Sequence, residues 1–269
     1  VTISHGGFIK RFPVSGYRRQ GRGGKGVTGA GTKEDDFIEH MFVASTHQYI
    51  LFFTDKGRCY WLKVHEVPEG GRTARGRSVV NLLDKDKDDN ITAFVAVKEF
   101  REDQYLIMAT QKGTIKKTVL AAYGNVRKGG INAINLAAGD SLIEVKMTDG
   151  KNDIVIGTSH GSAIRFNEKD VRDMGRTATG VRGVRLGKGD HVVGLLVIRN
   201  DQTTVLVVTE KGFGKRSDIN DYRITKRGGK GVITVKTTDK VGKLIAMMEV
   251  VDRDELVIIS TQGMVIRQS

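Results

Sequence analysis

Short apolar runs divided by a recurring polar turn extend through the whole chain. The turn reads Ser or Thr, two mostly polar residues and Gly, and it stands at residues 4–7, 54–57, 110–113, 158–161, 209–212 and 260–263. Glycine adopts the positive φ that tight hairpin turns require, so each site predicts the turn of a β-hairpin. No stretch shows the 3.6-residue period of an amphipathic helix, and we therefore expect very little helix.

Strand-like runs flank these turns, rich in the β-branched and aromatic residues that are typical of strands. A further apolar run is predicted to open each unit from the second onward. The runs before the turns include Tyr49–Phe53, Ile154–Ile156 and Val205–Val208, those after the turns include Thr114–Lys117 and Ser162–Phe166, and the additional runs include Ile91–Val97, His191–Val197 and Leu244–Met248.

The turns recur at a nearly constant spacing, since successive turn glycines are 50, 56, 48, 51 and 51 residues apart. Two further landmarks keep this register: Tyr17, Val67, Tyr123, Val171 and Tyr222 stand ten residues past the turn glycine, and Gly24, Gly76, Gly130, Gly180 and Gly229 stand 17 or 19 past it. The repeated tyrosines are interpreted as packing anchors.

The repeat predicts an all-β fold of six hairpin units. Each unit is too small to bury a face alone, so the units are expected to pack radially into a closed or nearly closed disc. The approximate units are 1–33, 34–84, 85–138, 139–187, 188–238 and 239–269. The first is expected to lack its opening strand, and the two chain ends are expected to lie near one another.

Composition narrows the class of protein. The 269 residues include 44 Lys and Arg against 31 Asp and Glu, a net charge of +13, and 39% are hydrophobic, which excludes a disordered basic tail. The 34 glycines and 2 prolines favour paired strands with tight turns. No apolar run is long enough for a membrane helix, and the single Cys59 indicates a reducing compartment. The chain starts at Val1 and reads as a piece of something longer.

Positive charge is concentrated in two stretches and at one repeated position. Residues 1–33 hold seven cations and no carboxylate, and residues 211–231 hold seven cations and two carboxylates. Equivalent positions of a radial repeat lie at equal radius, so a recurring cation predicts a ring around the rim that suits a duplex phosphate backbone. Four residues after each turn glycine stand Arg11, Trp61, Lys117, Arg165, Arg216 and Arg267.

A glycine-rich basic loop, Gln20-Gly-Arg-Gly-Gly-Lys-Gly26, stands out in the first unit. Bunched glycines let backbone N–H groups approach phosphate oxygens, while Arg22 and Lys25 supply charge. The loop matches G-x-G-x-x-G, but no βαβ unit surrounds it, and Gly26 after Lys25 excludes a Walker P-loop. The fifth unit repeats the form as Lys226-Arg-Gly-Gly-Lys-Gly231.

This loop resembles the GyrA box, Q-[RK]-R-G-G-[RK]-G, the signature of the C-terminal domain of gyrase A proteins. Gly21 departs from it, standing where the family usually has Arg or Lys. The six repeats cover the chain as the repeats of that family do. Further family-like stretches are 71–77 with 80–83, 108–110 with 113–118, and 179–186.

The resemblance implies a six-bladed β-pinwheel, a propeller-like disc whose blades exchange strands. It implies a non-catalytic part of an ATP-dependent type IIA topoisomerase, DNA gyrase, that wraps duplex DNA right-handedly around a basic rim, so that strand passage introduces negative supercoils. The expected partners are double-stranded DNA without sequence preference and the rest of gyrase A together with gyrase B in an A2B2 assembly. The expected location is the bacterial cytoplasm at the nucleoid, with no membrane contact. No cofactor is expected in this domain; ATP and Mg are expected elsewhere in the holoenzyme.

The predicted DNA-binding residues fall into two groups, and neither catalytic residues nor metal ligands are predicted. The box residues are Gln20, Gly21, Arg22, Gly23, Gly24, Lys25 and Gly26. The rim residues are Lys10, Arg11, Arg18, Arg19, Lys116, Lys117, Arg127, Lys128, Arg165, Arg182, Lys215, Arg216, Lys226, Arg227 and Lys230.

Two other functions remain open at this point. The C-terminal domain of the topoisomerase IV C protein is the nearest alternative, although its box is typically degraded and its ring often has fewer blades. A propeller-type protein-interaction module is the other, and it predicts weak DNA affinity. The six histidines form no local metal-binding motif. Residues 84–90 resemble the start of a calcium loop but have Asp89 where such a loop needs Gly. Cys59 is interpreted as a buried structural thiol.

Overall fold

The computed structural model describes residues 1–13, 36, 38–71, 74–86, 88–125, 127, 129–200, 202–252, 254, 256–259 and 265–268. Strands make up nearly all of the regular structure in these residues, as predicted. The strands are β1 (Thr2–Ser4), β2 (Phe8–Lys10), β3 (Ile38–Met41), β4 (Tyr49–Thr54), β5 (Arg58–Lys63), β6 (Arg77–Ser78), β7 (Ile91–Val97), β8 (Tyr105–Thr110), β9 (Thr114–Val119), β10 (Ile131–Asn132), β11 (Leu142–Thr148), β12 (Asp153–Thr158), β13 (Ser162–Asn167), β14 (Val181–Arg182), β15 (Val192–Ile198), β16 (Thr204–Thr209), β17 (Gly214–Asp218), β18 (Val232–Ile233), β19 (Leu244–Val250), β20 (Leu256–Ile259) and β21 (Val265–Gln268). Short 3-10 helices are η2 (Val64–Glu66), η3 (Val79–Asn81), η4 (Leu120–Tyr123), η5 (Glu168–Asp170) and η6 (Ile219–Asp221).

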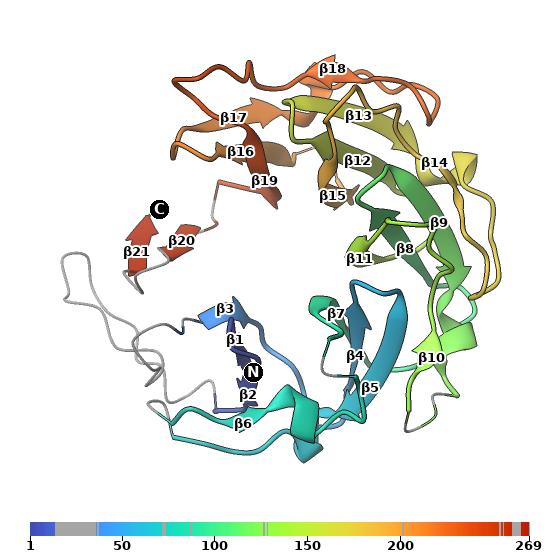
Figure 1. Ribbon diagram of the computed structural model, residues 1–269, viewed down its shortest axis with the longest axis vertical. Coiled ribbons are helices and arrows are strands. Elements are labelled where there is room, and N and C mark those ends of the chain that lie inside the picture. The colour runs from blue at the N-terminus through green and yellow to red at the C-terminus, as the bar shows by residue number, and fades with distance from the viewer. Residues whose placement is uncertain are drawn as a thin grey trace.

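The strands form separate small sheets arranged around a ring (Figure 1). Four sheets have four strands each, in the orders β3-β1-β2-β6, β7-β4-β5-β10, β11-β8-β9-β14 and β15-β12-β13-β18. The fifth sheet has the order β19-β16-β17. Strands β7, β11, β15 and β19 face the middle of the ring, and β6, β10, β14 and β18 lie at its periphery (Figure 1). The fold is therefore all-β and propeller-like.

The prediction of six blades is wrong for the described residues, which form five. The sixth repeat contributes only the two-stranded hairpin of β20 and β21, and residues 260–264 between them lie outside the described residues. The sequence repeat correctly indicates a sixth hairpin. A hairpin becomes a blade only when further strands pair with its edges, however, and no described strand pairs with this one.

The unit boundaries also differ from the prediction. The apolar run β7 pairs antiparallel with β4 of the preceding hairpin, with Tyr49 opposite Val97, and not with β8, which follows it. Such runs therefore close a blade and do not open one. The first sheet accordingly has its inner strand, β3, paired with β1, which corrects the expectation that this unit lacks one. An apolar pattern predicts a strand but does not identify its partner.

The outer strand of each four-stranded sheet comes from the next repeat. β6 follows the second hairpin but pairs with β2 of the first, and β10, β14 and β18 pair in the same way with β5, β9 and β13. This is the strand exchange that the resemblance implies. We call the stretches that carry these outer strands the exchange segments: residues 68–83, 124–139, 171–188 and 222–240.

The hydrophobic core lies between successive sheets. One cluster joins Leu51 and Phe53 of the second sheet to Leu106, Met108 and Leu142 of the third. Burial of this apolar surface stabilises each sheet, because a single small sheet cannot cover its own faces and depends on the neighbouring sheets to do so. The predicted packing anchors Tyr123 and Tyr222 are buried, as are Val67 and Val171 at the same position of the repeat, and Tyr17 lies outside the described residues.

Glycine is needed immediately before each exchange strand. Gly76, Gly130, Gly180 and Gly231 have φ of +87°, +72°, +106° and +78°. A Cβ on Gly231 would lie 2.2 Å from the carbonyl oxygen of Ala163, across the ladder that β18 forms with β13. In the fifth repeat the glycine before the exchange strand is therefore Gly231, 19 residues after the turn glycine Gly212, and not the predicted landmark Gly229. In the first repeat, a spacing of 19 residues from the turn glycine Gly7 leads to Gly26 and not to the predicted Gly24.

Two buried lysines beneath the exchange segments form hydrogen bonds with three of them. The ammonium of Lys116, which is fully buried, donates to the carbonyl oxygens of Ala133 and Arg176 in two different exchange segments. Lys10 donates to the carbonyl oxygens of Ala74 (2.7 Å) and Gly71 (3.2 Å). Burial lowers the pKa of both lysines, that of Lys116 to about 7, with Arg176 as a second cause there. These hydrogen bonds satisfy backbone groups of loops that lack a full ladder.

We expect Gly231→Ala to lower the free energy of unfolding by about 2 kcal/mol or more, since alanine is strained at this φ and its Cβ meets backbone. Gly187→Ala is the control, because Gly187 has open space around it and no positive φ. The free energy of unfolding of this control should differ from that of the parent chain by no more than about 0.5 kcal/mol. Urea unfolding monitored by circular dichroism measures both. Equal stability of the two variants would contradict this account of the exchange strand.

The stability of the chain should depend on pH through Lys116. Between pH 7 and 10.5 the unfolded chain holds a proton at this group that the folded chain has lost, because the folded pKa is about 7 and the ordinary value is 10.5. The contribution of Lys116 to the free energy of unfolding therefore rises with pH in this window, by at most about 1.4 kcal/mol per pH unit. Lys116→Met removes this contribution. Urea unfolding of both proteins across this pH window should show that the free energy of unfolding of the parent chain increases relative to that of the variant as pH rises. A difference that stays constant would show that Lys116 keeps its ordinary pKa in the folded chain.

Candidate nucleic-acid interface

The exchange segments carry much of the positive charge of the chain. Together they contain sixteen Lys and Arg and only three Asp and Glu. Their strands lie at the periphery of the ring (Figure 1). In the described residues these segments therefore form a cation-rich belt along the rim, and the cations are most numerous in the exchange segments 171–188 and 222–240, which contain eleven of the sixteen.

The cations four residues past the turn glycines do not form the predicted ring of free surface charge. Lys117 and Arg165 are buried, and each forms an ion pair, with Asp173 at 3.0 Å and with Asp153 at 2.8 Å. Arg165 also donates to the carbonyl oxygen of Ile219 at 2.8 Å. The prediction of surface charge is wrong for both residues because the next repeat covers the outer side of each hairpin.

The other members of this repeated position differ among themselves. Arg11 is half-buried, donates to the carbonyl oxygen of Val67 at 2.9 Å and pairs with Glu69 at 2.8 Å. Arg216 is exposed, and it contacts the Thr204 hydroxyl and the carboxylate of Asp252. Lys10 and Lys116, predicted as rim residues, lie beneath the exchange segments as described above. Their burial corrects that prediction too, since a buried ammonium bonded to carbonyl groups does not reach solvent.

Besides Arg216, five further predicted rim residues are exposed: Arg127, Arg182, Lys215, Lys226 and Lys230. Lys226 donates to the carboxylate of Asp170 at 3.0 Å while 90% of its side chain remains exposed. DNA contact by these residues stays a prediction. The box residues Gln20, Gly21, Arg22, Gly23, Gly24, Lys25 and Gly26 lie outside the described residues, as do Arg18, Arg19 and Lys128.

Arg227 has a structural position that its sequence context did not indicate. It is half-buried, and its guanidinium donates to the carbonyl oxygens of Asp170 and Arg182, both at 2.9 Å. Arg176, at the same distance before its exchange glycine, donates to the carbonyl oxygen of Asn132 at 3.2 Å. Each arginine thus links its own exchange segment to the preceding one along the rim.

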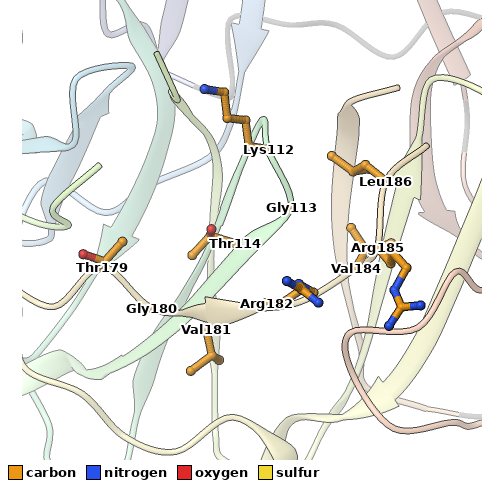
Figure 2. Close-up of a pocket in the computed structure, with 10 residues that line it drawn as sticks. All are labelled: Lys112, Gly113, Thr114, Thr179, Gly180, Val181, Arg182, Val184, Arg185 and Leu186. Atoms are coloured by element: carbon orange, nitrogen blue, oxygen red, sulfur yellow. The ribbon is translucent and has the colours of Figure 1, made fainter. Parts of the chain in front are cut away.

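Among the exposed cations that sequence reasoning missed are Lys112, Arg185 and Lys236. Lys112 and Arg185 line a surface hollow of about 620 Å³ together with Arg182 (Figure 2). Arg185 and Lys236 each stand five residues past an exchange glycine, Gly180 and Gly231. Aligning the repeat on the exchange glycines, and not on the hairpin turns alone, would have identified both.

Little in the described residues suggests other chemistry. No group of three or more His, Cys, Asp or Glu there is placed to hold a metal ion. Cys59 is fully buried, and burial raises the pKa of its thiol. A thiol in this state has little nucleophilic character. Within the same residues, no helix has the length and apolar composition needed to cross a membrane.

Solved structures of topoisomerase C-terminal domains resemble this one. A structure of the DNA gyrase A C-terminal domain has a TM-score of 0.82 and 26% sequence identity, and the match covers 99% of this chain and 87% of that one. The C-terminal domain of DNA topoisomerase IV matches with a TM-score of 0.81, 26% identity and coverage of 99% and 81%. The two structural matches do not separate these alternatives.

Sequence comparison separates them in favour of gyrase. The DNA gyrase A proteins of Staphylococcus aureus strains MRSA252 and NCTC 8325 are 46% identical to the chain over 269 residues, or 99% of it. The chain corresponds to 30% of the length of each relative. Residues 1–45, 48–97, 104–149, 152–199, 203–250 and 254–269 match the family described as "DNA gyrase C-terminal domain, beta-propeller". The chain belongs to this family.

Proposed function

We propose that this chain wraps duplex DNA around its rim. The observation that carries the proposal is the belt of exchange segments, in which cations far outnumber carboxylates along the outer edge of the ring. Lysine and arginine contacts to phosphates release counterions and give affinity without reading the base sequence. A convex rim with charge along its length favours DNA that follows the curve.

The energies permit such bending. Smoothly bending 20–30 bp by 40–90° costs about 1–6 kcal/mol, so enclosing much of the ring requires on the order of 10 kcal/mol. Six to ten phosphate contacts change affinity by about 10³ to 10⁵ over a modest change in salt, which corresponds to several kcal/mol. The exposed cations of the exchange segments and the basic box are numerous enough to supply contacts on this scale.

Within a gyrase, wrapping has a direction. A right-handed wrap presents the adjoining DNA segment to strand passage in one orientation, so that each ATP-driven cycle introduces negative supercoils. The domain is non-catalytic in this proposal, and DNA cleavage, ATP hydrolysis and Mg binding belong to the remainder of gyrase A and to gyrase B in an A2B2 assembly. The similarity to bacterial gyrase A proteins supports this assignment and a location at the nucleoid.

The test is a linking-number measurement. A nicked circular DNA is sealed with ligase in the presence of the 269-residue chain, and the topoisomers are separated after the protein is removed. We expect positive topoisomers whose number of added turns increases with the protein-to-DNA ratio. Tight binding with an unchanged linking number would contradict wrapping.

Variants of the box make the measurement specific. Arg22→Ala combined with Lys25→Ala should abolish the positive topoisomers. Lys25→Ala alone is the cleaner variant, because Arg22 has the same spacing to Gly26 as Arg176 has to Gly180, and Arg176 bonds within the protein. Lys151→Ala, which removes an exposed charge outside the exchange segments, is the matched control and should behave like the parent chain.

A further inference from the structure

A surface hollow lies where the third sheet receives its exchange strand. β14 pairs with β9 there, with Arg182 opposite Thr114 and Val181 opposite Ile115. The hollow has a volume of about 620 Å³, and Lys112 of the β8–β9 turn lines it together with Arg182 and Arg185 (Figure 2). Two repeats therefore contribute cations to one concave site. We call this pairing of β9 with β14 the third-sheet seam.

The cations of this seam are not neutralised by the protein. Arg182 and Arg185 are exposed, and neither guanidinium has a hydrogen bond or ion pair with any residue that the structure describes. The ammonium of Lys112 donates to the carbonyl oxygen of Ala138 at 2.7 Å and has further N–H groups to donate. The lining includes no carboxylate; nearby Asp140 accepts from the backbone N–H of Lys112 at 2.9 Å.

These groups match the chemistry of a phosphodiester. A guanidinium presents paired N–H donors that fit two phosphate oxygens, and it keeps its charge at every physiological pH. The lining also contains the hydroxyl groups of Thr114 and Thr179, which donate hydrogen bonds to phosphate oxygens. A hollow with unpaired cations and hydroxyl groups, open to solvent at the periphery, suits a backbone that passes along it.

The fourth sheet shares with the third a cation five residues past the exchange glycine, which the first two sheets lack, although His160 and Ile233 stand where the third sheet has Lys112 and Arg182. At the pairing of β13 with β18, Lys230 stands one residue before the exchange glycine Gly231 and Lys236 five residues after it, and both are exposed. The position of Arg185 and Lys236 is occupied by Asn81 in the first sheet and by Asn135 in the second. The unpaired cations of this position are therefore confined to the third and fourth sheets.

We propose that the third-sheet seam is a phosphate-binding subsite for duplex DNA, formed by Lys112, Arg182 and Arg185, and that the duplex is gripped most firmly along the third and fourth sheets. The inference rests on the wrapping function proposed above and assigns its principal contacts. It differs from a uniform ring in that the repeats contribute unequally, because the first two sheets present neutral asparagine at the equivalent position.

The experiment measures how duplex affinity depends on salt. The 269-residue chain is titrated against a linear mixed-sequence duplex between about 50 and 200 mM salt, and the slope of log K against log salt is compared among variants. The test variant is Arg182→Gln combined with Arg185→Gln, which removes two charges from exposed side chains. Its slope should fall in magnitude by about two, at about 0.9 per phosphate contact, and its affinity at the lower salt should fall on the order of tenfold or more.

The matched control is Lys151→Gln combined with Lys169→Gln, which removes the same charge from exposed positions beside β12 and β13, at the end away from the Gly161 turn. Its slope should change by much less than that of the test variant. Urea unfolding verifies that both variants are as stable as the parent chain. Equal losses in the two variants, or no loss in the test variant, would overturn the subsite while leaving duplex binding in place. A parent chain that does not bind duplex at all would instead overturn the proposed function.

Discussion

The pairing of each outer strand with the hairpin of the preceding repeat is the interaction on which the rest of this structure depends. A two-residue strand such as β14 forms a very short ladder with β9. Its segment is held in addition by the buried Lys116 beneath it and by the link from Arg176 to the second exchange segment. Each blade is complete only when the next repeat has supplied its edge, so neighbouring blades stabilise one another.

Strand exchange also determines where the charge of the chain can act. Where an exchange segment covers a hairpin, it also covers cations of that hairpin, and Lys117 and Arg165 are thereby used for ion pairs and carbonyl contacts. Several cations on the exchange segments, among them Arg182, Arg185 and Lys230, are exposed to solvent, because these segments form the outer layer. Lysine and arginine therefore stabilise the fold where they lie beneath the exchange segments and present charge to solvent where they are exposed at the periphery.

This division bears on the proposed wrapping of DNA. The exchange segments present their cations along the rim of the first four sheets, whereas a ring of hairpin residues would be interrupted there by the covering strands. The belt is not uniform, however: Asn81 and Asn135 are neutral where Arg185 and Lys236 are charged. Unequal repeats give the rim a strongly and a weakly charged arc, although the backbone repeats from blade to blade.

The sequence by itself determined the local structure: the hairpins, their turn glycines, the near absence of helix and the number of repeats. These properties follow from backbone sterics and from the alternation of apolar residues, which act over a few neighbouring positions. It also carried the family signature in the box. Only the tertiary structure decided that β7 pairs with β4, that Gly231 and not Gly229 precedes an exchange strand, and that Lys116 and Arg165 are buried. These outcomes depend on which edge a strand meets and on what lies above a side chain, and both are set by contacts between residues that are far apart along the chain.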